Sequence, residues 1–290
     1  MIGLGIDVVV CAKNREKPMA NLLRQITSEI PIENLIVVYG TSSDRTREVA
    51  LQFTDKVYWD EDEGLGAARN LGIRKSSSEI VAMIDTDVIL PKDWYKKLVR
   101  HFDDSKVAAA TGTCIYGYGC SPLQKWWEYF GRLADVQWGC HNVMFRRSAV
   151  LSIGNFNKEI KGAGEDYDVF KRLLKAGFKW AWAKEVVVFH PMNAFETLKH
   201  NIWWAKGVTS LNGEKPFSAV DLAFRLLYMI RRNMEHVTIH PILSGYLPIV
   251  DMIWLMTDFK TRCARQKKSV LNVAAKGMLA GKRGSEFDIQ

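Results

Sequence analysis

The most constraining feature of this sequence is a regular alternation of short apolar runs with helical segments over roughly its first two thirds. Each run is long enough for one buried strand, and most segments between the runs place apolar residues at helical spacing. The runs cover residues 6–10, 35–39, 56–59, 80–84, 107–115 and 180–189, and the main helical segments cover 18–30, 45–53, 66–71, 93–102, 124–136 and 166–176. Alternation of this kind predicts βαβ units and a mixed, mainly parallel sheet flanked by helices.

The composition fits a large folded core in a reducing environment. The chain has 290 residues, of which 48% are hydrophobic, enough for one large domain or for one domain with an appendage. Its five cysteines include no Cys-x-x-Cys pair, so we expect neither a structural zinc site nor a disulfide framework. The N-terminus runs into the first apolar run without a signal peptide. These features predict a cytoplasmic location.

The last third of the chain differs from the rest in charge and hydropathy. The net charge is +8: residues 1–198 hold 26 basic and 25 acidic residues, whereas residues 199–290 hold 14 and 7. The segments 219–230 and 236–257 are strongly apolar, and the second contains one formal charge, Asp251. A carboxylate in the middle of a membrane-spanning helix costs roughly 2.5–3.5 kcal/mol, so we expect helices that lie in the membrane interface instead of crossing it.

Basic residues flank these apolar segments, as an interfacial anchor on anionic lipid requires. They are Arg231, Arg232, Lys260, Arg262, Arg265, Lys267 and Lys268. The sequence therefore predicts an α/β domain over residues 1–197 and a helical region over 198–290 that associates with an anionic membrane surface. A buried helical hairpin or an oligomer interface is the alternative. Because the positive charge lies beside apolar helices, lipid fits better than nucleic acid, and no nucleic-acid partner is expected.

Two carboxylates, Asp85 and Asp87, directly follow the apolar run 80–84. Residues i and i+2 of an extended chain point to the same side, so both side chains can face one ligand while Thr86 faces away. Open α/β sheets bind ligands at the carboxyl ends of their strands, and paired carboxylates suit Mg²⁺ or Mn²⁺, which suits a diphosphate. The alternative is a solvated turn that happens to carry two acids.

Five motifs in chain order resemble those of family 2 glycosyltransferases of the GT-A fold. They are the strand and loop at 8–16, the strand 35–38 with the Ser-x-Asp-x-Thr turn at 42–46, the Gly…Ala-Arg-Asn-x-Gly element at 64–72, the Asp-x-Asp at 85–87, and the Glu-Asp-x-Asp helix start at 165–168. The resemblance covers roughly residues 5–195. It implies a GT-A catalytic domain and an inverting reaction on a nucleotide sugar that depends on Mn²⁺ or Mg²⁺.

The resemblance also implies roles for individual residues. Asp87 would be the principal metal ligand, Asp85 would bind the metal or the ribose, and His190 would be an additional metal ligand. Asp166 or Glu165 would be the catalytic carboxylate, which deprotonates an acceptor hydroxyl or positions an acceptor that is already ionised. The donor nucleotide would contact Ala12, Asn14, Glu16, Asp44, Arg69, Asp85, Thr86 and Asp87.

Each of these roles has a structural alternative. His190 would then be a strand-end histidine bonded to backbone, and Arg69 a charge on a helix surface. Glu165, Asp166 and Asp44 would serve as helix caps, since carboxylates favour the positive end of the helix dipole.

Two departures from the family pattern affect the nucleobase pocket. Tyr39-Gly40 stands where the family usually has two aspartates, one of which commonly reads the base, and Cys11 replaces the usual proline. Asp44 would be a partial substitute for the missing acids, or else the helix cap named above.

Several basic and aromatic residues are candidates for acceptor contacts. Arg132, Arg146 and Arg147 would bind an acceptor phosphate or are surface charges. The pairs Trp126-Trp127 and Trp203-Trp204 suit a sugar face or a lipid interface, or belong to a core.

The apolar, basic C-terminal third further resembles the polyprenyl-phosphate sugar synthases, including the dolichol-phosphate mannose synthases. This resemblance implies a hexosyltransferase at the cytoplasmic membrane face that moves mannose from GDP-mannose to a polyprenyl or dolichyl phosphate. The alternatives are a glycan- or protein-directed glycosyltransferase with another nucleotide sugar, and a non-catalytic, membrane-bound nucleotide-sugar-binding module. A nucleotidyltransferase is disfavoured because residues 11–18 contain no glycine-rich phosphate loop.

Overall fold

The computed structural model of the chain describes a large N-terminal part and selected C-terminal segments. The described residues are 5–117, 121, 122, 124, 125, 128, 137–160, 162–212, 223, 226, 227, 230, 246–261 and 263. The chain divides into two compact units, Met1–Leu198 and Lys199–Gln290, which are considered separately below.

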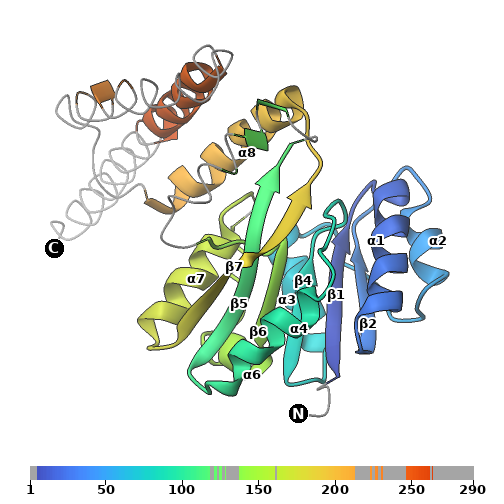
Figure 1. Cartoon of the computed structure of the whole chain (residues 1–290). Helices are drawn as coiled ribbons and strands as arrows, with labels where there is room; N and C mark the ends of the chain where they lie inside the picture. Colours follow the sequence, from blue (N-terminus) through green and yellow to red (C-terminus); the bar gives the residue numbers. More distant parts are fainter. Residues whose placement is uncertain are drawn as a thin grey trace, which may run out of the picture. The chain divides into compact units, whose positions relative to one another are not determined.

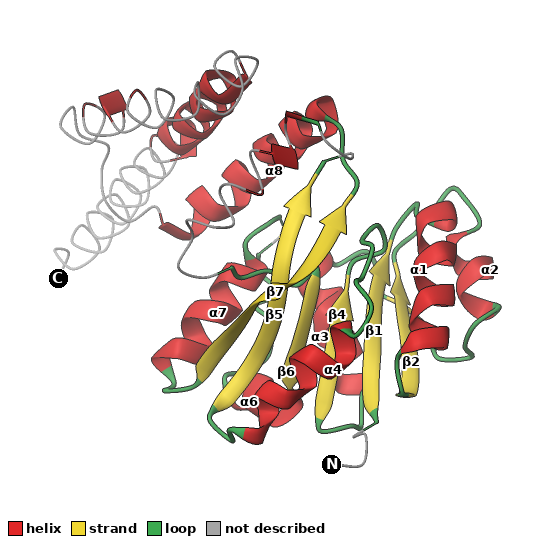
Figure 2. Ribbon diagram, in the orientation of Figure 1, coloured by secondary structure: helices red, strands yellow, loops and turns green. Residues whose placement is uncertain are grey.

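The first unit contains a seven-stranded sheet within its described residues, in the order β3-β2-β1-β4-β6-β5-β7 (Figures 1 and 2). The strands are β1 (Ile6–Ala12), β2 (Ile32–Tyr39), β3 (Val57–Trp59), β4 (Ile80–Ile84), β5 (Val107–Tyr116), β6 (Asn142–Arg146) and β7 (Lys179–His190). Strands β1 to β4 pair in parallel, as do β5 and β7, whereas β6 is antiparallel to both β4 and β5. The mixed, mainly parallel sheet predicted from the sequence is confirmed.

Helices cover both faces of this sheet (Figure 2). They are α1 (Glu16–Glu29), α2 (Thr46–Leu51), α3 (Leu65–Lys75), α4 (Trp94–Val99), the 3₁₀ helix η1 (Arg100–Asp103), α6 (Arg147–Ser152) and α7 (Glu165–Lys175). Helix α8 (Ala194–Asn212) follows β7 in the chain and belongs mostly to the second unit. Helices α1, α2 and α4 pack in one apolar cluster, and α3, α6 and α7 pack in the other. All five residues of β4 are buried, as expected for a strand covered on both faces.

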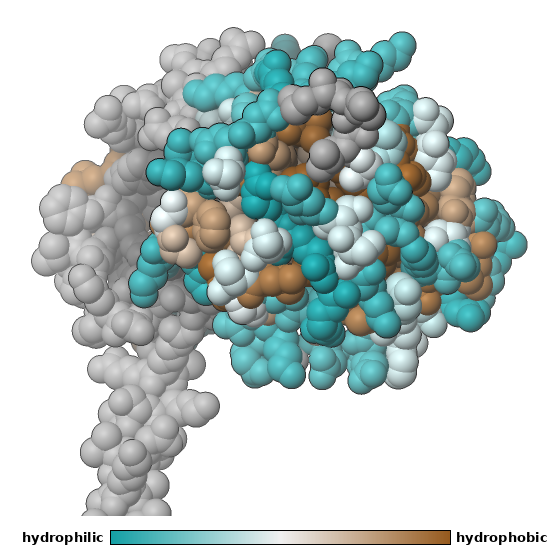
Figure 3. Space-filling view, turned by 90° about the horizontal axis from the view of Figure 1, so that it is seen from below, coloured by the Kyte–Doolittle hydropathy of each residue, from teal (hydrophilic) through white to brown (hydrophobic). Residues whose placement is uncertain are grey.

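The end of the sheet at which β1 begins is covered mainly by hydrophilic residues, with smaller apolar areas between them (Figure 3). The opposite end, where β1, β2 and β4 finish, carries the Asp-x-Asp turn. The fold therefore places the Asp-x-Asp turn at the end of the sheet opposite this mainly hydrophilic surface.

Strand β6 was not predicted from the sequence. It has only five residues, and its apolar core of three residues is too short to identify a strand by itself. It becomes a strand because it fills the position between β4 and β5, where its first four residues are buried. The predicted helix 124–136 lies almost entirely outside the described residues.

The second unit contains most of α8 and a helical segment at 246–261. The indole Nε1 of Trp254 donates to Oδ1 of Asn201 at 3.0 Å, and Leu247 is fully buried. Within the part of the chain that the structure describes, no helix combines the length and the hydropathy that crossing a membrane requires. Most of 219–230 and 236–245 falls outside the described residues, so the interfacial association stays a prediction.

Candidate active site

The Asp-x-Asp turn extends from the carboxyl end of β4. The Asp85 N–H donates to the carbonyl oxygen of His141 at 3.1 Å, which fixes the start of the turn against the residue before β6. Thr86 is buried, whereas the side chains of Asp85 and Asp87 are 39% and 26% exposed. Two accessible carboxylates on either side of a buried threonine fit the geometry that the i, i+2 spacing predicts.

Asp87 meets His190, which is distant in sequence. Nε2 of His190 lies 3.2 Å from Oδ1 of Asp87. An antiparallel bridge between Ile89 and Phe189, with hydrogen bonds of 2.8 and 3.1 Å, joins the end of β7 to the segment after the turn. Nδ1 of His190 is buried and has no hydrogen-bond partner. The structure thus places the histidine beside the aspartate, as its expected role as a metal ligand requires.

Asp87 and His190 fit a divalent ion. A carboxylate oxygen and an imidazole nitrogen face each other, and both are ligands that Mn²⁺ accepts. No group of three or more histidine, cysteine, aspartate or glutamate side chains with metal-site geometry occurs among the residues described. Phosphate oxygens and water are further ligands that Mg²⁺ accepts in proteins.

Arg69 links the turn to helix α7. Its guanidinium is 5% exposed, forms an ion pair with Oε1 of Glu165, and lies 3.4 Å from Oδ1 of Asp85. Burial disfavours its charge, but Cys140, Glu165 and Asp85 more than compensate, so the pKa of Arg69 is raised above its usual value. The expected contact of Arg69 with a donor is untested. The structure places this side chain between two carboxylates, so it is not a surface charge.

The two acids at the start of α7 have different environments. Glu165 is 2% exposed, and burial raises its pKa to about 7 although Arg69 opposes the shift. Oε2 of Glu165 has no partner. Asp166 is half-buried, its Oδ1 accepts the Tyr167 N–H at 2.8 Å, and burial raises its pKa against the opposing charge of Arg69. Asp166 is therefore the more accessible of the two acids, and a raised pKa makes either carboxylate a stronger base than a free one.

His141 and Tyr116 belong to this site, but the sequence motifs did not identify them. The Tyr116 ring lies 5.0 Å from the His190 ring and contacts the His141 ring edge-on at 6.3 Å. Burial lowers the pKa of His141 to about 4, with smaller opposing and reinforcing effects from Asp85 and His190. The sequence indicates these two residues only weakly: Tyr116 directly follows the apolar run 107–115, and His141 comes shortly before the apolar residues 143–145.

Other residues that were predicted to contact the donor connect the loop after β1 with the loop after β2. The Asn14 N–H donates to Oγ of Ser42 at 3.0 Å, and the Glu16 N–H donates to Oδ2 of Asp44 at 3.0 Å. Asp44 also accepts the Thr46 N–H at 3.1 Å, and its hydrogen bond from the Thr46 hydroxyl lowers its pKa. Asp44 thus accepts the N–H of the first residue of α2, just before the N-cap residue Arg45, and joins this helix start to the loop at Glu16.

Ala12 lies at the edge of the same loops. It is 6% exposed, and its carbonyl oxygen accepts the Gly40 N–H at 3.0 Å. Ala12, Asn14, Glu16 and Asp44 therefore come together where β1 and β2 end, although their contact with a nucleotide stays a prediction.

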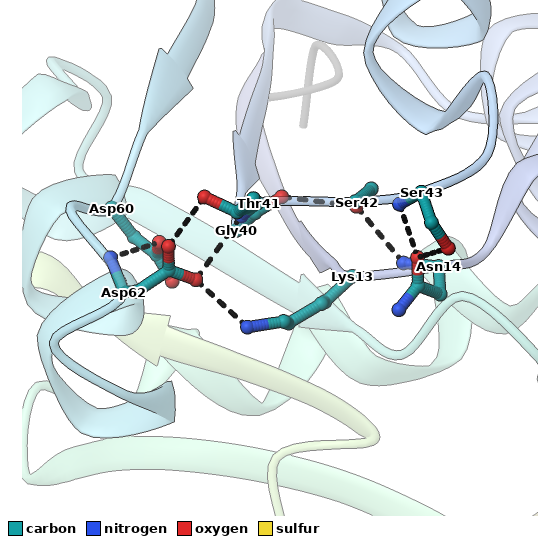
Figure 4. A network of polar contacts seen from close by, with 8 residues as sticks. All are labelled: Lys13, Asn14, Gly40, Thr41, Ser42, Ser43, Asp60 and Asp62. Atoms are coloured by element: carbon teal, nitrogen blue, oxygen red, sulfur yellow. Dashed lines mark hydrogen bonds and ion pairs between the residues drawn. The ribbon is translucent and has the colours of Figure 1, made fainter.

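Acids from a third loop surround Gly40, where the family pattern has an aspartate (Figure 4). Lys13 donates to Oδ1 of Asp62 at 2.8 Å, and Asp62 N–H donates to Oδ1 of Asp60 at 2.9 Å. A Cβ added to Gly40 would lie 3.1 Å from Cδ of Lys13, 3.3 Å from Oδ1 of Asp62 and 3.4 Å from Oδ1 of Asp60. The hydrogen bond from Lys13 lowers the pKa of Asp62 to about 2. The carboxylates absent at 39–40 are thus present nearby, on the segment after β3.

The structure places Arg146 and Arg147 away from the Asp-x-Asp turn, which disfavours a role as acceptor-phosphate ligands and leaves the alternative of charges outside the site. Arg146 pairs with Ile80 in the β6–β4 register, at the start of β4, and forms an ion pair with Glu79. Arg147 donates to the carbonyl oxygen of Ile73 at 3.1 Å. Both lie at the end of the sheet opposite the Asp-x-Asp turn, because β6 runs antiparallel to β4.

The remaining aromatic and basic candidates are only partly described. Arg132, Trp126 and Trp127 lie outside the described residues. Trp203 of α8 is 40% exposed, and the ring of His200 makes edge contacts with both Trp203 and Trp204.

Comparisons with known proteins identify the family to which the chain belongs. A family model described as Glycosyl transferase family 2 matches residues 7–156, just over half of the chain. Glycosyltransferase AglE of Haloferax volcanii is 26% identical over 220 residues, which cover 70% of this chain and 72% of that protein. A glucosyl-dolichyl phosphate glucuronosyltransferase of the same organism is 23% identical over 184 residues, covering 56% of this chain and 59% of that protein.

Solved structures share the fold. Mannosyltransferase PcManGT from Pyrobaculum calidifontis, solved in complex with GDP-Man and Mn²⁺, has a TM-score of 0.60 at 17% identity over 98% of this chain and 81% of that one. Glucosyl-3-phosphoglycerate synthase from Mycobacterium tuberculosis, solved with Mn²⁺, UDP-glucose and phosphoglyceric acid, has a TM-score of 0.51 at 20% identity over 71% and 78%. The sheet and its flanking helices are thus a GT-A fold.

Proposed function

Because this chain belongs to glycosyl transferase family 2 and is a nucleotide-sugar-dependent glycosyltransferase, we propose that it moves a hexose to a lipid-linked acceptor. The proposed donor is GDP-mannose, the acceptor is a polyprenyl or dolichyl phosphate, and the reaction inverts the anomeric centre. The observation that carries the proposal is the meeting of Asp87 with His190 at 3.2 Å beside Asp85, with Asp166 at the adjoining helix start.

Asp87 and His190 would hold the divalent ion, with Asp85 as a further ligand or as a contact to the ribose. Such an ion offsets the negative charge that develops on the leaving nucleoside diphosphate. Arg69 keeps Asp85 and Glu165 in fixed relation and so orients the turn relative to α7.

Asp166 would act on the acceptor. Its raised pKa suits removal of a proton from a hydroxyl during in-line attack. A phosphate acceptor is already ionised, so with a polyprenyl phosphate Asp166 would chiefly position the attacking oxygen. Glu165, buried against Arg69, would support that position without touching the acceptor.

The choice of donor and acceptor is supported by similar proteins. The mannosyltransferase with the same fold was solved with GDP-Man and Mn²⁺, and one relative is a dolichyl-phosphate-linked glucuronosyltransferase. The second unit adds a physical argument. Ile249, Met252 and Met256 recur at helical spacing on the 246–261 segment and are 53%, 46% and 50% exposed. Such a stripe suits the proposed association with an anionic membrane surface at its cytoplasmic face.

Transfer of radiolabel tests the reaction. The full-length chain is incubated with labelled GDP-mannose and Mn²⁺, together with polyprenyl phosphate, a free oligosaccharide or an acceptor peptide. We expect lipid-soluble product only with polyprenyl phosphate. Product on the oligosaccharide or peptide alone would establish a glycan- or protein-directed enzyme, and transfer only from a UDP-sugar would refute the donor assignment.

Metal dependence and membrane binding need separate measurements. Removal of divalent ions with EDTA should abolish transfer, and Mn²⁺ should restore it. In flotation with anionic vesicles, the wild-type chain should float, and Met252→Asp with Met256→Asp should remain at the bottom with the transfer rate to a short-chain acceptor unchanged. Equal flotation of both proteins would refute the interfacial role of this stripe.

A further inference from the structure

His141 occupies the centre of the site although no sequence motif includes it. It directly precedes β6, and its carbonyl oxygen accepts the Asp85 N–H at 3.1 Å. Because β6 pairs antiparallel with β4, with Ile84 opposite Asn142, residue 141 lies beside the start of the Asp-x-Asp turn. The sheet register therefore fixes its position relative to Asp85.

The imidazole of His141 lies near the acid of α7, while its backbone carbonyl oxygen contacts the Asp-x-Asp turn. A Cβ added to Gly139 would lie 2.7 Å from Nδ1 of His141 and 3.8 Å from Oδ2 of Asp166, so both groups border the same small space. On its other side the ring contacts Tyr116 at 6.3 Å, and Tyr116 in turn lies 5.0 Å from His190. The ring is thus near Asp166 directly and near His190 through Tyr116.

The hydrogen-bonding capacity of this imidazole is unused. Nε2 is buried without a partner, and the ring forms no hydrogen bond to any residue of the described part of the first unit. A buried polar atom left unpaired costs about 1–3 kcal/mol, which a ligand that supplies the partner recovers. Gly139, at a φ of +152°, provides the room for the ring, because a side chain there would overlap it.

The chemistry of the surroundings selects the kind of partner. An anionic phosphate beside His141 would also approach the carboxylates of Asp85 and Asp166 and be repelled by them. A hydroxyl group is neutral and can both donate and accept a hydrogen bond, so it can pair with Nε2 of His141 in either tautomer of the neutral ring. In the proposed reaction the diphosphate lies at Asp87 and the acceptor at Asp166, so the transferred hexose must bridge the space between them.

We propose that His141 binds a hydroxyl group of the hexose that is transferred, and so contributes to the choice of donor sugar. The proposal rests on the proposed function, because it requires a nucleotide sugar bound at the Asp-x-Asp turn. His141 is a substrate contact in this assignment and is distinct from Asp166, which serves the acceptor.

Two affinities measured by calorimetry test the proposal. The full-length chain and His141→Ala are titrated with GDP and with GDP-mannose in Mn²⁺. Loss of one hydrogen bond should weaken GDP-mannose binding about 10-fold and leave GDP within about two-fold. His141→Gln, which retains an amide donor and acceptor, should recover part of the loss. His101→Ala is the matched control, because Nε2 of His101 is also buried and unpartnered. His101 lies on η1, which precedes the start of β5, whereas Tyr116 of the site lies at the other end of that strand.

Deoxy analogues of GDP-mannose identify the hydroxyl. For the analogue that lacks the contacted hydroxyl, wild type and His141→Ala should bind equally, whereas the other analogues should retain the 10-fold difference. A difference that is the same for every analogue would refute a hydrogen bond to the sugar.

Other outcomes separate this inference from the proposed function. An equal loss of GDP and GDP-mannose affinity, a change confined to the KM of the acceptor, or no change at all would each overturn the role of His141 and leave the proposed reaction intact. Failure of the wild-type chain to bind any nucleotide sugar would overturn the proposed function and the role of His141 with it. Thermal unfolding of His141→Ala and His141→Gln shows whether either variant is folded.

Discussion

The two ends of the sheet both bury a carboxylate, and they use it differently. At the end where β1 begins, Asp7 is fully buried and its carboxylate accepts the backbone N–H groups of Ser77 and Ser78 at 2.5 and 3.0 Å. The Ser78 hydroxyl and the Asn34 amide donate to its other oxygen at 2.8 and 2.6 Å. Burial alone would raise the pKa of Asp7, but these hydrogen bonds lower it on balance.

At the end where β4 finishes, buried polar atoms lack partners. They are Oε2 of Glu165, Nδ1 of His190 and Nε2 of His141. Native proteins pair nearly all such atoms, so a cluster of unpaired ones marks a place where a ligand completes the bonding. Burial therefore does not distinguish Asp7 from Glu165, whereas hydrogen bonding does: both carboxylate oxygens of Asp7 are paired, and Oε2 of Glu165 belongs to a group of unpaired atoms at the end that carries the Asp-x-Asp turn.

Replacement of Asp87 should have the largest effect and should fall on activity alone. Asp87→Asn keeps the size of the side chain but weakens metal binding, so we expect transfer to fall about 10³-fold. The melting temperature should change little, because this side chain is partly exposed. Asp93→Asn is the control, since Asp93 is 56% exposed and asparagine tolerates its φ of +63°. A large loss of stability in Asp87→Asn would place Asp87 in the same class as Asp7.

Replacement of Asp7 should show the opposite pattern. Asp7→Asn turns an NH₂ group toward backbone donors, and we expect it to cost about 2–4 kcal/mol of unfolding free energy. Urea denaturation measures the loss, and the exposed Asp55→Asn is its control. The transfer rate per folded molecule should stay within about two-fold, and a fall comparable to that of Asp87→Asn would break the distinction between the two ends.

Replacements of the two acids at the start of α7 should have different kinetic effects. With a polyprenyl phosphate, Asp166→Asn should raise the KM of the acceptor about 10-fold while the affinity for GDP stays unchanged. At pH 8, where Glu165 is ionised, Glu165→Gln should affect kcat and stability together, because the neutral side chain leaves Arg69 without its ion-pair partner. Identical kinetic profiles for the two variants would contradict the assignment of acceptor contact to Asp166 alone.

The smallest effect is a pH dependence of stability that comes from Glu165. Its folded pKa of about 7 exceeds the value of 4.5 expected for the unfolded chain, so the folded state holds the extra proton between these pH values. The contribution of Glu165 to unfolding free energy therefore falls as pH rises from about 4.5 to about 7.

Melting temperatures at pH 5.5 and 8 detect this contribution. Glu165→Gln carries no titrating group, so its melting temperature relative to wild type should rise between the two pH values. A difference that stays constant or falls would mean that Glu165 is ionised throughout. The contribution of Asp7 to unfolding free energy should change with pH in the opposite direction, because the stability that comes from its lowered pKa is lost as pH falls.

Much of the fold was predictable because its signals are local. The apolar runs of β1, β2 and β4 and the stripe of Met19, Leu22 and Ile26 on α1 need no knowledge of distant residues. β6 was not predicted, since five residues form a strand here only because β4 and β5 flank them. The same dependence on distant partners explains why the sequence left two alternatives open for Arg146, whose strand runs to the opposite end of the sheet.

The sequence by itself determined the class of the protein. The strand-helix alternation, the Asp85-Thr86-Asp87 spacing and the acids at 165 and 166 are short-range patterns, and they specify the GT-A sheet and the family. The tertiary structure decided which side chains meet: His190 with Asp87, Arg69 with Glu165, and the carboxylates of 60 and 62 around Gly40. His141 likewise emerged only from the fold. Contacts between residues far apart in the chain depend on sheet order and strand direction, which no local pattern contains.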